Sequence, residues 1–220
     1  MGCSGSKSKE KNVKNSKGIR MSKSPTQKQK ERLFEIKIVL LGDQAVGKSS
    51  LVNRFCSGNF DDKYKSTIGG AYLQKEVTLK NGDILKLHIW DTGGQEKFRS
   101  MASLYYKDSV AAILVYDISN PESFESLSFW VKELRENVEN ENFVISVAGN
   151  KNDLPSEEKK VAYNQAKNFM KENGITIFYE TSAKIGNGVK ELFTGLAQEV
   201  YEVQKKINEQ MNKENNNNNI

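Results

Sequence analysis

The sequence has little cysteine, proline or histidine, with only 2, 3 and 1 residues of these types among 220. Cys3 and Cys56 lie far apart in the chain, which argues against a disulfide framework or a structural zinc site. We therefore expect a reducing, intracellular compartment. The single histidine, His88, has no nucleophile or metal-binding cluster beside it in sequence, so we expect a surface residue on a strand.

Long apolar runs are also missing. The longest, residues 110–116, has seven residues, whereas a helix that spans a bilayer needs about 18 or more. A membrane-spanning helix is therefore excluded. A chain of 220 residues is long enough to bury one ordinary core and still carry tails.

Positive charge is concentrated at one end of the chain. Residues 1–32 hold ten lysines and arginines against two glutamates, which leaves 23 basic and 26 acidic residues in the rest. A basic segment on a mildly acidic body indicates an anionic surface that the segment alone contacts, either a membrane leaflet or a nucleic acid. We expect a disordered basic arm at 1–34, one folded domain at 35–204 and a disordered, Asn-rich tail at 205–220.

Strand-like and helix-like segments alternate through the folded region. Asn81-Gly82 predicts a tight turn between two antiparallel strands. Asn120 and Pro121 fit the start of a helix, and Gly174 fits the end of another. The expected strands are 36–41, 72–79, 84–90, 111–116, 143–148 and 175–179, and the expected helices are 48–55, 123–138, 161–173 and 189–206.

This order predicts an α/β fold of three layers. We expect a doubly wound, mostly parallel sheet of about six strands with one antiparallel edge. Ligands of such sheets bind at the carboxyl ends of the strands, so the segments that follow the strands are where chemistry is expected.

The segment 42–49 reads GDQAVGKS and matches the phosphate-loop pattern G-x-x-x-x-G-K-[ST] between a predicted strand and a predicted helix. Its glycines let consecutive N–H groups and the positive helix end face phosphate groups. Lys48 offers a positive charge to the β- and γ-phosphates, and the Ser49 hydroxyl can ligate Mg²⁺. The expected nucleotide contacts are Gly42, Ala45, Val46, Gly47, Lys48, Ser49 and Ser50.

The segment 90–96, WDTGGQE, follows the second strand of the predicted hairpin. Asp91 can therefore help to hold Mg²⁺ at the same edge of the sheet, and the Gly94 N–H can bind a γ-phosphate. Taken alone, the segment would be an ordinary turn. Together with the phosphate loop it predicts a nucleotide sensor.

Two further polar segments, NKND at 150–153 and TSAK at 181–184, are expected to select the base. Asp153 can accept from the ring N–H and the exocyclic amine of guanine, a donor pair that adenine lacks, and a backbone N–H near Ala183 can donate to the guanine carbonyl. Each segment alone is compatible with a polar loop, but both follow strands in the expected order. The expected base-binding residues are Asn150, Lys151, Asp153, Ser182, Ala183 and Lys184.

Over residues 35–204 these motifs resemble the small GTPases of the Ras superfamily, and within it the Rab family. Similarity to its endosomal subgroup comes from KSSLV at 48–52, STIG at 66–69 and AAILVYD at 111–117. The resemblance implies a P-loop GTPase domain, binding of GTP or GDP with Mg²⁺, and GTP hydrolysis that is slow without an activating protein. It also implies a GTP-dependent role in vesicular or endosomal trafficking.

The resemblance further assigns roles to single residues. Phe60 would stack on guanine, Tyr64 and Thr67 would belong to switch I, and Thr67 would bind Mg²⁺ and the γ-phosphate. Gln95 would orient the attacking water while Lys48 stabilises developing charge. The implied protein partners are an exchange factor, an activating protein and GTP-dependent effectors, and we expect a monomer.

Three aromatic residues, Tyr72, Trp90 and Tyr105, match the triad that Rabs present to effectors. Ordinary packing between the switches and the sheet is the alternative interpretation of these side chains.

Two residues depart from the family pattern. Gln44 stands where Rabs usually carry serine, and we hypothesise that its long amide crowds the attacking water or an incoming arginine. The alternative function is then a slow or GTP-locked scaffold, unless Gln44 swings into solvent. Gly93 replaces a common alanine, which predicts a more mobile switch II.

The N-terminal residues MGCSGS match the acylation pattern M-G-x-x-x-[ST], which predicts myristoylation of Gly2 and palmitoylation of Cys3. Because no cysteine follows Cys56, we expect no C-terminal prenylation. With the basic arm, this predicts a lipid anchor on the cytoplasmic face of endosomal or plasma membrane. A solubilising or nuclear-import tail is the alternative, and a nucleic-acid partner is not expected because the arm lacks interleaved aromatics.

Overall fold

The computed structural model describes residues 33–63, 66–95 and 102–217, with side chains described as far as residue 214. Residues 1–32 of the predicted basic arm, with the acylation sites Gly2 and Cys3, lie outside these ranges, and so does Tyr64. The first strand already begins at Leu33, inside the segment predicted as arm.

Six strands form one sheet in the order β2-β3-β1-β4-β5-β6. Only β2 and β3 pair antiparallel, and the other neighbours are parallel. The predicted doubly wound fold with one antiparallel edge is therefore confirmed. The elements are β1 Leu33–Leu41, α1 Lys48–Ser57, β2 Gly70–Thr78, β3 Ile84–Thr92, α2 Ala102–Tyr106, β4 Ala111–Asp117, α3 Pro121–Glu125, α4 Leu127–Asn137, β5 Val144–Asn150, the 3-10 turn η2 Ser156–Glu158, α5 Tyr163–Glu172, β6 Ile177–Glu180 and α6 Val189–Asn217.

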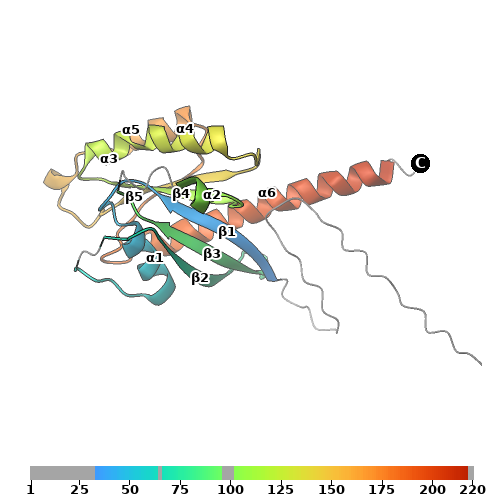
Figure 1. Cartoon of the computed structure of the whole chain (residues 1–220), viewed down its shortest axis with the longest axis horizontal. Coiled ribbons are helices and arrows are strands. Elements are labelled where there is room, and N and C mark those ends of the chain that lie inside the picture. Colours follow the sequence, from blue (N-terminus) through green and yellow to red (C-terminus); the bar gives the residue numbers. More distant parts are fainter. Residues whose placement is uncertain (1–32, 64–65, 96–101, 218–220) are drawn as a thin grey trace, which may run out of the picture.

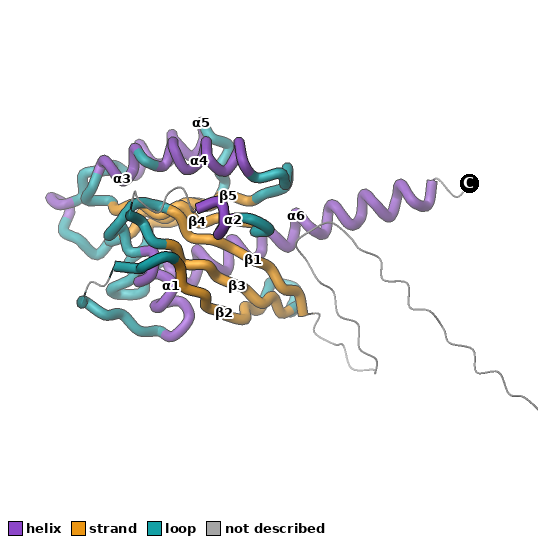
Figure 2. The backbone as a smooth tube through the Cα atoms, in the orientation of Figure 1, coloured by secondary structure: helices purple, strands orange, loops and turns teal. Residues whose placement is uncertain are grey.

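Helices cover both faces of the sheet, and strand residues alternate between two cores (Figure 1). Ile36, Ile38 and Leu40 of β1 pack with α1 and α6, whereas Val39 and Leu41 pack with α2 to α5. Because both faces are buried, β1 is almost continuously apolar from Ile38, as expected for a central parallel strand. Figure 2 shows the strands as the middle of the three layers.

Local signals in the sequence set several boundaries. The Asn120 side chain accepts from the Glu122 N–H, and Pro121 takes the first helical position, as predicted. Gly174, with φ +60°, follows Asn173, the C-cap residue of α5. The single helix predicted over 123–138 is divided at Ser126 into α3 and α4. The short α2 and η2 were not predicted.

The prediction of a disordered tail from residue 205 is wrong for residues 205–217, because α6 continues to Asn217. Leu192, Phe193 and Leu196 are buried, so packing on the sheet nucleates the helix. Extending an existing helix costs little. Side-chain hydrogen bonds one turn apart add support, since Gln198 donates to Glu202 (2.8 Å). The second half of α6 consequently projects beyond the sheet (Figure 1).

Within the described ranges, no helix combines the length and the apolar character needed to cross a bilayer.

Candidate nucleotide-binding site

The phosphate loop connects β1 to α1 with an unusual backbone. Gly42 has φ +138°, and a Cβ there would lie 2.2 Å from the Val115 carbonyl oxygen of β4. Gly94 approaches the loop from the end of β3, where a Cβ would meet the Asp43 carbonyl oxygen at 2.4 Å. Only glycine permits both approaches. The loop is therefore curled tightly around the position of Lys48.

Lys48 is buried at the start of α1. Its Nζ donates to the carbonyl oxygens of Gly42 and Asp43, both at 2.8 Å. Burial lowers the pKa of Lys48 to about 8, against the opposing attraction of Asp91 and Asp43. The ammonium group is thus held in the loop by neutral oxygens, where anionic phosphate oxygens would stabilise its charge much better.

Three oxygen-bearing side chains meet beside Lys48. The Ser49 and Thr67 hydroxyl oxygens lie 2.7 Å apart. Asp91 is buried, its Oδ1 has no hydrogen-bond partner within the described chain, and burial raises its pKa despite Ser49 and Lys48. An unpartnered carboxylate oxygen next to two hydroxyls suits a hard divalent cation such as Mg²⁺. These residues fit the predicted magnesium site.

The base end is organised around Asn150, the last residue of β5. Its Nδ2 donates to the Val46 carbonyl oxygen (2.9 Å), which ties the base segment to the phosphate loop. Its Oδ1 accepts from the Thr181 hydroxyl (3.3 Å) and the Ala183 N–H (3.2 Å). The Ala183 N–H, one of the backbone donors in the segment expected to meet the guanine carbonyl, therefore already has an internal partner.

Asp153 and Lys151 are also positioned by neighbours. The Ser182 hydroxyl donates to Asp153 Oδ1 (2.5 Å), and Lys151 Nζ lies 2.6 Å from Asp117 Oδ2 at the end of β4. Lys151 has φ +72°, a left-handed backbone that is uncommon for a residue with a side chain.

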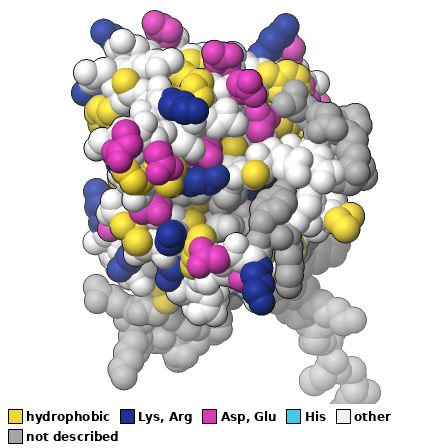
Figure 3. All heavy atoms as spheres, turned by 90° about the vertical axis from the view of Figure 1, so that its left-hand side faces the viewer, with side chains coloured by type: hydrophobic (Ala, Val, Ile, Leu, Met, Phe, Trp, Pro, Cys, Tyr) yellow, Lys and Arg dark blue, Asp and Glu magenta, His cyan; other side chains and the backbone are white. Residues whose placement is uncertain are grey.

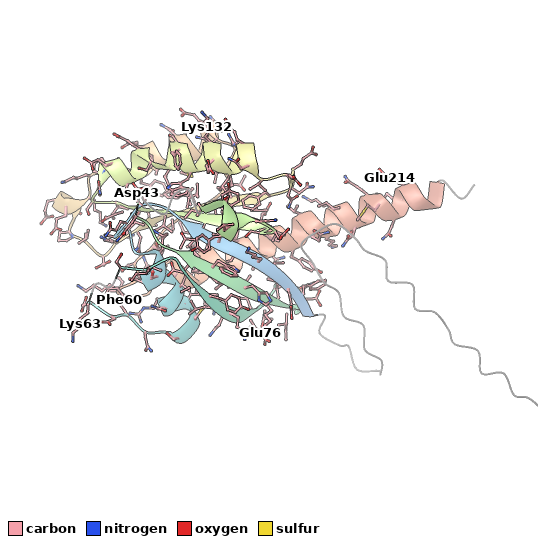
Figure 4. The ribbon with its side chains drawn as sticks, in the orientation of Figure 1. Asp43, Phe60, Lys63, Glu76, Lys132 and Glu214 are labelled. Atoms are coloured by element: carbon pink, nitrogen blue, oxygen red, sulfur yellow. The ribbon has the colours of Figure 1, made fainter. Side chains whose placement is uncertain are left out.

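All these segments open into one cavity of about 430 Å³ at the carboxyl ends of the parallel strands. Asp43, Phe60 and Lys63 are at this end in Figure 4, far from Glu214. The expected residues that line it are Ala45, Gly47, Lys48, Ser49, Ser50, Phe60, Thr67, Gly94, Asn150, Lys151, Asp153, Ala183 and Lys184. The other expected residues Gly42, Val46, Asp91, Gln95 and Ser182 are not among its lining residues but contact residues that are.

The sequence model of the Ras family matches residues 37–202. The chain belongs to the Ras family. It is 45% identical over 203 residues to the Ras-related protein Rab-5B of Plasmodium falciparum, covering 91% of this chain and 94% of the relative. It is 47% identical over 169 residues to Rab-5A of Dictyostelium discoideum, covering 77% of this chain and 82% of that protein. The GTP-binding protein ypt5 of Schizosaccharomyces pombe is 46% identical over 164 residues, covering 74% and 77%.

These relatives place this Ras-family chain among the Rab-type small GTPases, enzymes that hydrolyse GTP. The predicted family and class of activity are confirmed.

The two segments of this Ras-family chain that we expect to act as switches touch beside the cavity. Gln95 Nε2 donates to the Ser66 hydroxyl oxygen at 2.8 Å. The residue expected to orient water is therefore held against the segment that carries Thr67. Gln44 lines the same cavity.

The three expected effector aromatics form a continuous group across β2, β3 and α2. Ring centroids are 5.7 Å apart for Tyr72 and Trp90 and 6.2 Å apart for Trp90 and Tyr105. Tyr72 is 49% exposed, and Lys37 Nζ lies 4.9 Å from the Trp90 ring centroid. Tyr72 is therefore accessible, whereas Trp90 is packed by its neighbours. The arrangement agrees both with ordinary packing and with contact to a partner.

His88 lies on β3 and is partly exposed, which agrees with the expected strand position at the surface. Its Nδ1 lies 2.5 Å from the Tyr72 hydroxyl, and its Nε2 lies 3.3 Å from Glu35 Oε2. Within the described ranges, no three His, Cys, Asp or Glu residues are grouped to hold a metal ion.

Sequence reasoning missed residues that position others rather than line the cavity. Asp117 holds Lys151, Thr181 holds Asn150, Ser66 holds Gln95, and Arg54 holds the segment that contains Ala183. These contacts join segments far apart in the chain, and the separation between Arg54 and Ala183 is 129 residues. No spacing rule along the sequence would have paired them.

Proposed function

We propose that this Rab-type GTPase is a switch for membrane trafficking that binds GTP or GDP with Mg²⁺ and recruits effectors only when GTP is bound. The observation that carries the proposal is that the phosphate loop, the Ser49–Thr67 pair and Asp153 all line the same cavity. Phosphate groups, a divalent cation and a guanine base would each find their own partners there.

The proposed chemistry is in-line attack of water on the γ-phosphate of GTP. Lys48 and the loop N–H groups stabilise charge that develops on the phosphate oxygens, and Gln95 orients the water. Ser49, Thr67 and Asp91 would hold Mg²⁺, which neutralises charge on the β- and γ-phosphates when bound. An activating protein that supplies an arginine would accelerate the step.

The proposed conformational switch depends on the contacts that Thr67 and Gly94 would make with the γ-phosphate. Thr67 and Gly94 approach the cavity from the two switch segments, and Gln95 donates to Ser66. Loss of the γ-phosphate removes the group that Thr67 and Gly94 share, so the segments can separate. An exchange factor would then restore GTP.

The membrane part of the proposal depends on residues outside the described ranges. The N-terminal motif with Gly2 and Cys3 supports myristoylation and palmitoylation, and the basic segment supports attraction to an anionic leaflet. Because the relatives are Rab-5 and ypt5 proteins, we propose the cytoplasmic face of endosomes as the site of action.

A nucleic-acid partner is not supported by the folded domain. On the face that carries the cavity, lysine and arginine side chains are interspersed with aspartate and glutamate side chains (Figure 3). A basic footprint for nucleic acid would instead gather one sign of charge.

Nucleotide identity and turnover test the function. The purified protein should retain GDP or GTP but not ADP or ATP, and should convert bound GTP to GDP in a single-turnover assay with Mg²⁺. The variant Gln95→Leu should retain binding and lose about 100-fold or more in hydrolysis rate. Equal binding of adenine and guanine nucleotides would overturn the proposal.

A slow, GTP-locked scaffold is the second candidate, because Gln44 lines the cavity where Rabs usually carry serine. Such a protein would be purified mainly with GTP, and an activating protein would not accelerate its turnover.

A further inference from the structure

Arg54 is placed behind the base end of the cavity. It lies near the end of α1, is half-buried, and is not among the residues that line the cavity. We propose that Arg54 is a positioning residue that sets how long a guanine nucleotide stays bound and how sharply its carbonyl edge is recognised. The proposal rests on the nucleotide function proposed above.

The guanidinium group joins two separate segments. Its Nε donates to the Ala183 carbonyl oxygen (2.7 Å), and its Nη2 donates to the Lys184 carbonyl oxygen (2.5 Å). Its Nη1 donates to the carbonyl oxygen of Gly58, the C-cap residue that follows α1. The two consecutive carbonyls are therefore fixed relative to the end of α1.

Fixing those carbonyls also fixes the N–H groups of the same segment. Because each peptide unit is planar, the Ala183 carbonyl sets the direction of the Lys184 N–H, and the Lys184 carbonyl sets that of the Ile185 N–H. The Ala183 N–H, in the preceding peptide unit, donates to Asn150 Oδ1 at 3.2 Å, a long hydrogen bond. Small rotations of this segment would therefore change what its N–H groups offer to a base.

The same arginine also faces the other wall of the cavity. Its Cζ lies 6.0 Å from the ring centroid of Phe60, within cation–π range. Phe60 lines the cavity from the segment after α1, and Ala183 and Lys184 line it from the segment after β6. Arg54 thus holds together the two segments that would have to part for a bound base to leave.

A lysine could not replace these contacts. The guanidinium presents several N–H donors in a planar fork and stays charged, whereas an ammonium group is a point donor without that geometry. Arg54→Lys keeps the charge and most of the aliphatic stem, so it removes the fork with little disturbance of packing.

The first experiment measures release of fluorescently labelled GDP by stopped flow from the full-length protein. Arg54→Lys should release GDP about tenfold faster, and Arg54→Gln faster still. Arg135→Lys is the matched control, because Arg135 donates to the Asn173 carbonyl oxygen at the end of another helix, away from the cavity. Unchanged release from Arg54→Lys, or equal acceleration by Arg135→Lys, would overturn the proposal.

The second experiment asks whether the effect is local to the base. Binding of GDP is compared with 6-thio-GDP, which carries sulfur, a weaker acceptor, in place of the guanine carbonyl oxygen but keeps the ring N–H and the amine, and with IDP, which lacks the exocyclic amine expected to meet Asp153. Arg54→Lys should reduce discrimination against 6-thio-GDP about threefold or more, and leave the ratio of IDP to GDP affinity unchanged. A general loosening of the fold would shift neither ratio, and that result would overturn the positioning role.

Failure of the proposed function gives a different result. If the unmodified protein binds none of these nucleotides, the nucleotide switch itself is wrong. If it binds GDP tightly but Arg54→Lys behaves like the unmodified protein, only the role of Arg54 is wrong.

Discussion

Lys151 Nζ lies 2.6 Å from Asp117 Oδ2, which joins the segment after β5 to the end of β4. The Asp117 side chain is 9% exposed, and its Oδ1 also accepts from the Ser119 N–H (2.9 Å) and hydroxyl (2.7 Å). This ion pair is therefore part of a fixed network beside the base end of the cavity, unlike a solvent-exposed pair.

Breaking that pair should loosen the base end. Asp117→Asn leaves Lys151 half-buried without a counter-charge, so we expect the free energy of unfolding to fall by about 1–3 kcal/mol and GDP release to accelerate. Urea denaturation and stopped-flow release measure the two effects. Glu136→Gln is the control, because its pair with Lys132 spans 3.8 Å with side chains 61% and 73% exposed. Such a surface pair contributes about 0–1 kcal/mol.

Tyr106 should make stability sensitive to alkaline pH. Burial, followed by the hydrogen bond to Glu133 (2.9 Å), raises the pKa of Tyr106 to about 12. An unfolded tyrosine ionises near pH 10, so above that pH the unfolded state loses its proton first and is favoured. The contribution of Tyr106 is complete below about pH 10 and is lost as pH rises toward about 12.

The variant Tyr106→Phe should therefore lose less stability than the unmodified protein between about pH 10 and pH 12. At neutral pH it should be less stable by about 1 kcal/mol, because the hydrogen bond to Glu133 is gone. Urea denaturation of both proteins over this pH range gives the comparison. Parallel pH profiles would show that Tyr106 does not carry the alkaline dependence.

Replacing Tyr116 by phenylalanine should stabilise the protein at neutral pH, whereas the same substitution at Tyr106 should destabilise it. The Tyr116 hydroxyl is buried without a hydrogen-bond partner in the described part of the chain, and burial raises its pKa. Tyr116→Phe removes a desolvated, unpaired group and should raise the free energy of unfolding by about 1 kcal/mol. A loss of stability in thermal or urea denaturation would mean that the hydroxyl is satisfied internally.

Gln44 can be tested by restoring the usual residue of the family. If its amide crowds the attacking water or an incoming arginine, Gln44→Ser should hydrolyse GTP faster in a single turnover. The same assay with and without an activating protein separates an intrinsic effect from interference with the arginine. Equal rates for both proteins would remove the hypothesis of a slow scaffold.

The proposed anchor can be tested with one conservative substitution. Gly2→Ala replaces the N-terminal glycine that N-myristoylation requires, so the protein should move from the membrane to the cytosolic fraction. Cys3→Ser should give a partial release, since one acyl chain alone binds weakly. Intact mass of the native N-terminus shows whether the acyl groups are present. Membrane binding of Gly2→Ala equal to that of the unmodified protein would count against this anchor.

The fold could be predicted from the sequence because its signals are local. The turn at Asn81-Gly82, the capping pair Asn120-Pro121 and the apolar residues of β1 each identify their element from neighbouring residues. The phosphate loop could be recognised for the same reason. The helical tail could not, because α6 beyond Lys206 depends on nucleation by buried residues that precede it.

The contacts that hold the site were beyond sequence reasoning. Arg54 reaches Ala183, and Asn150 reaches Val46, only after the sheet has brought their segments together. A charged or amide side chain in a helix or loop has many possible partners, and the fold selects one. Motifs therefore identified the residues that face the ligand, while the structure identified those that hold them.

The start of β1, where the chain enters the folded domain, and the cavity lie at opposite ends of that domain. β1 begins at Leu33 at the end from which α6 projects, whereas Asp43 and Phe60 lie at the other end (Figures 1 and 4). A tether ahead of Leu33 would consequently turn the nucleotide toward the surrounding solution. Loading, unloading and reading of the switch could then proceed without detaching the protein from the surface that holds it.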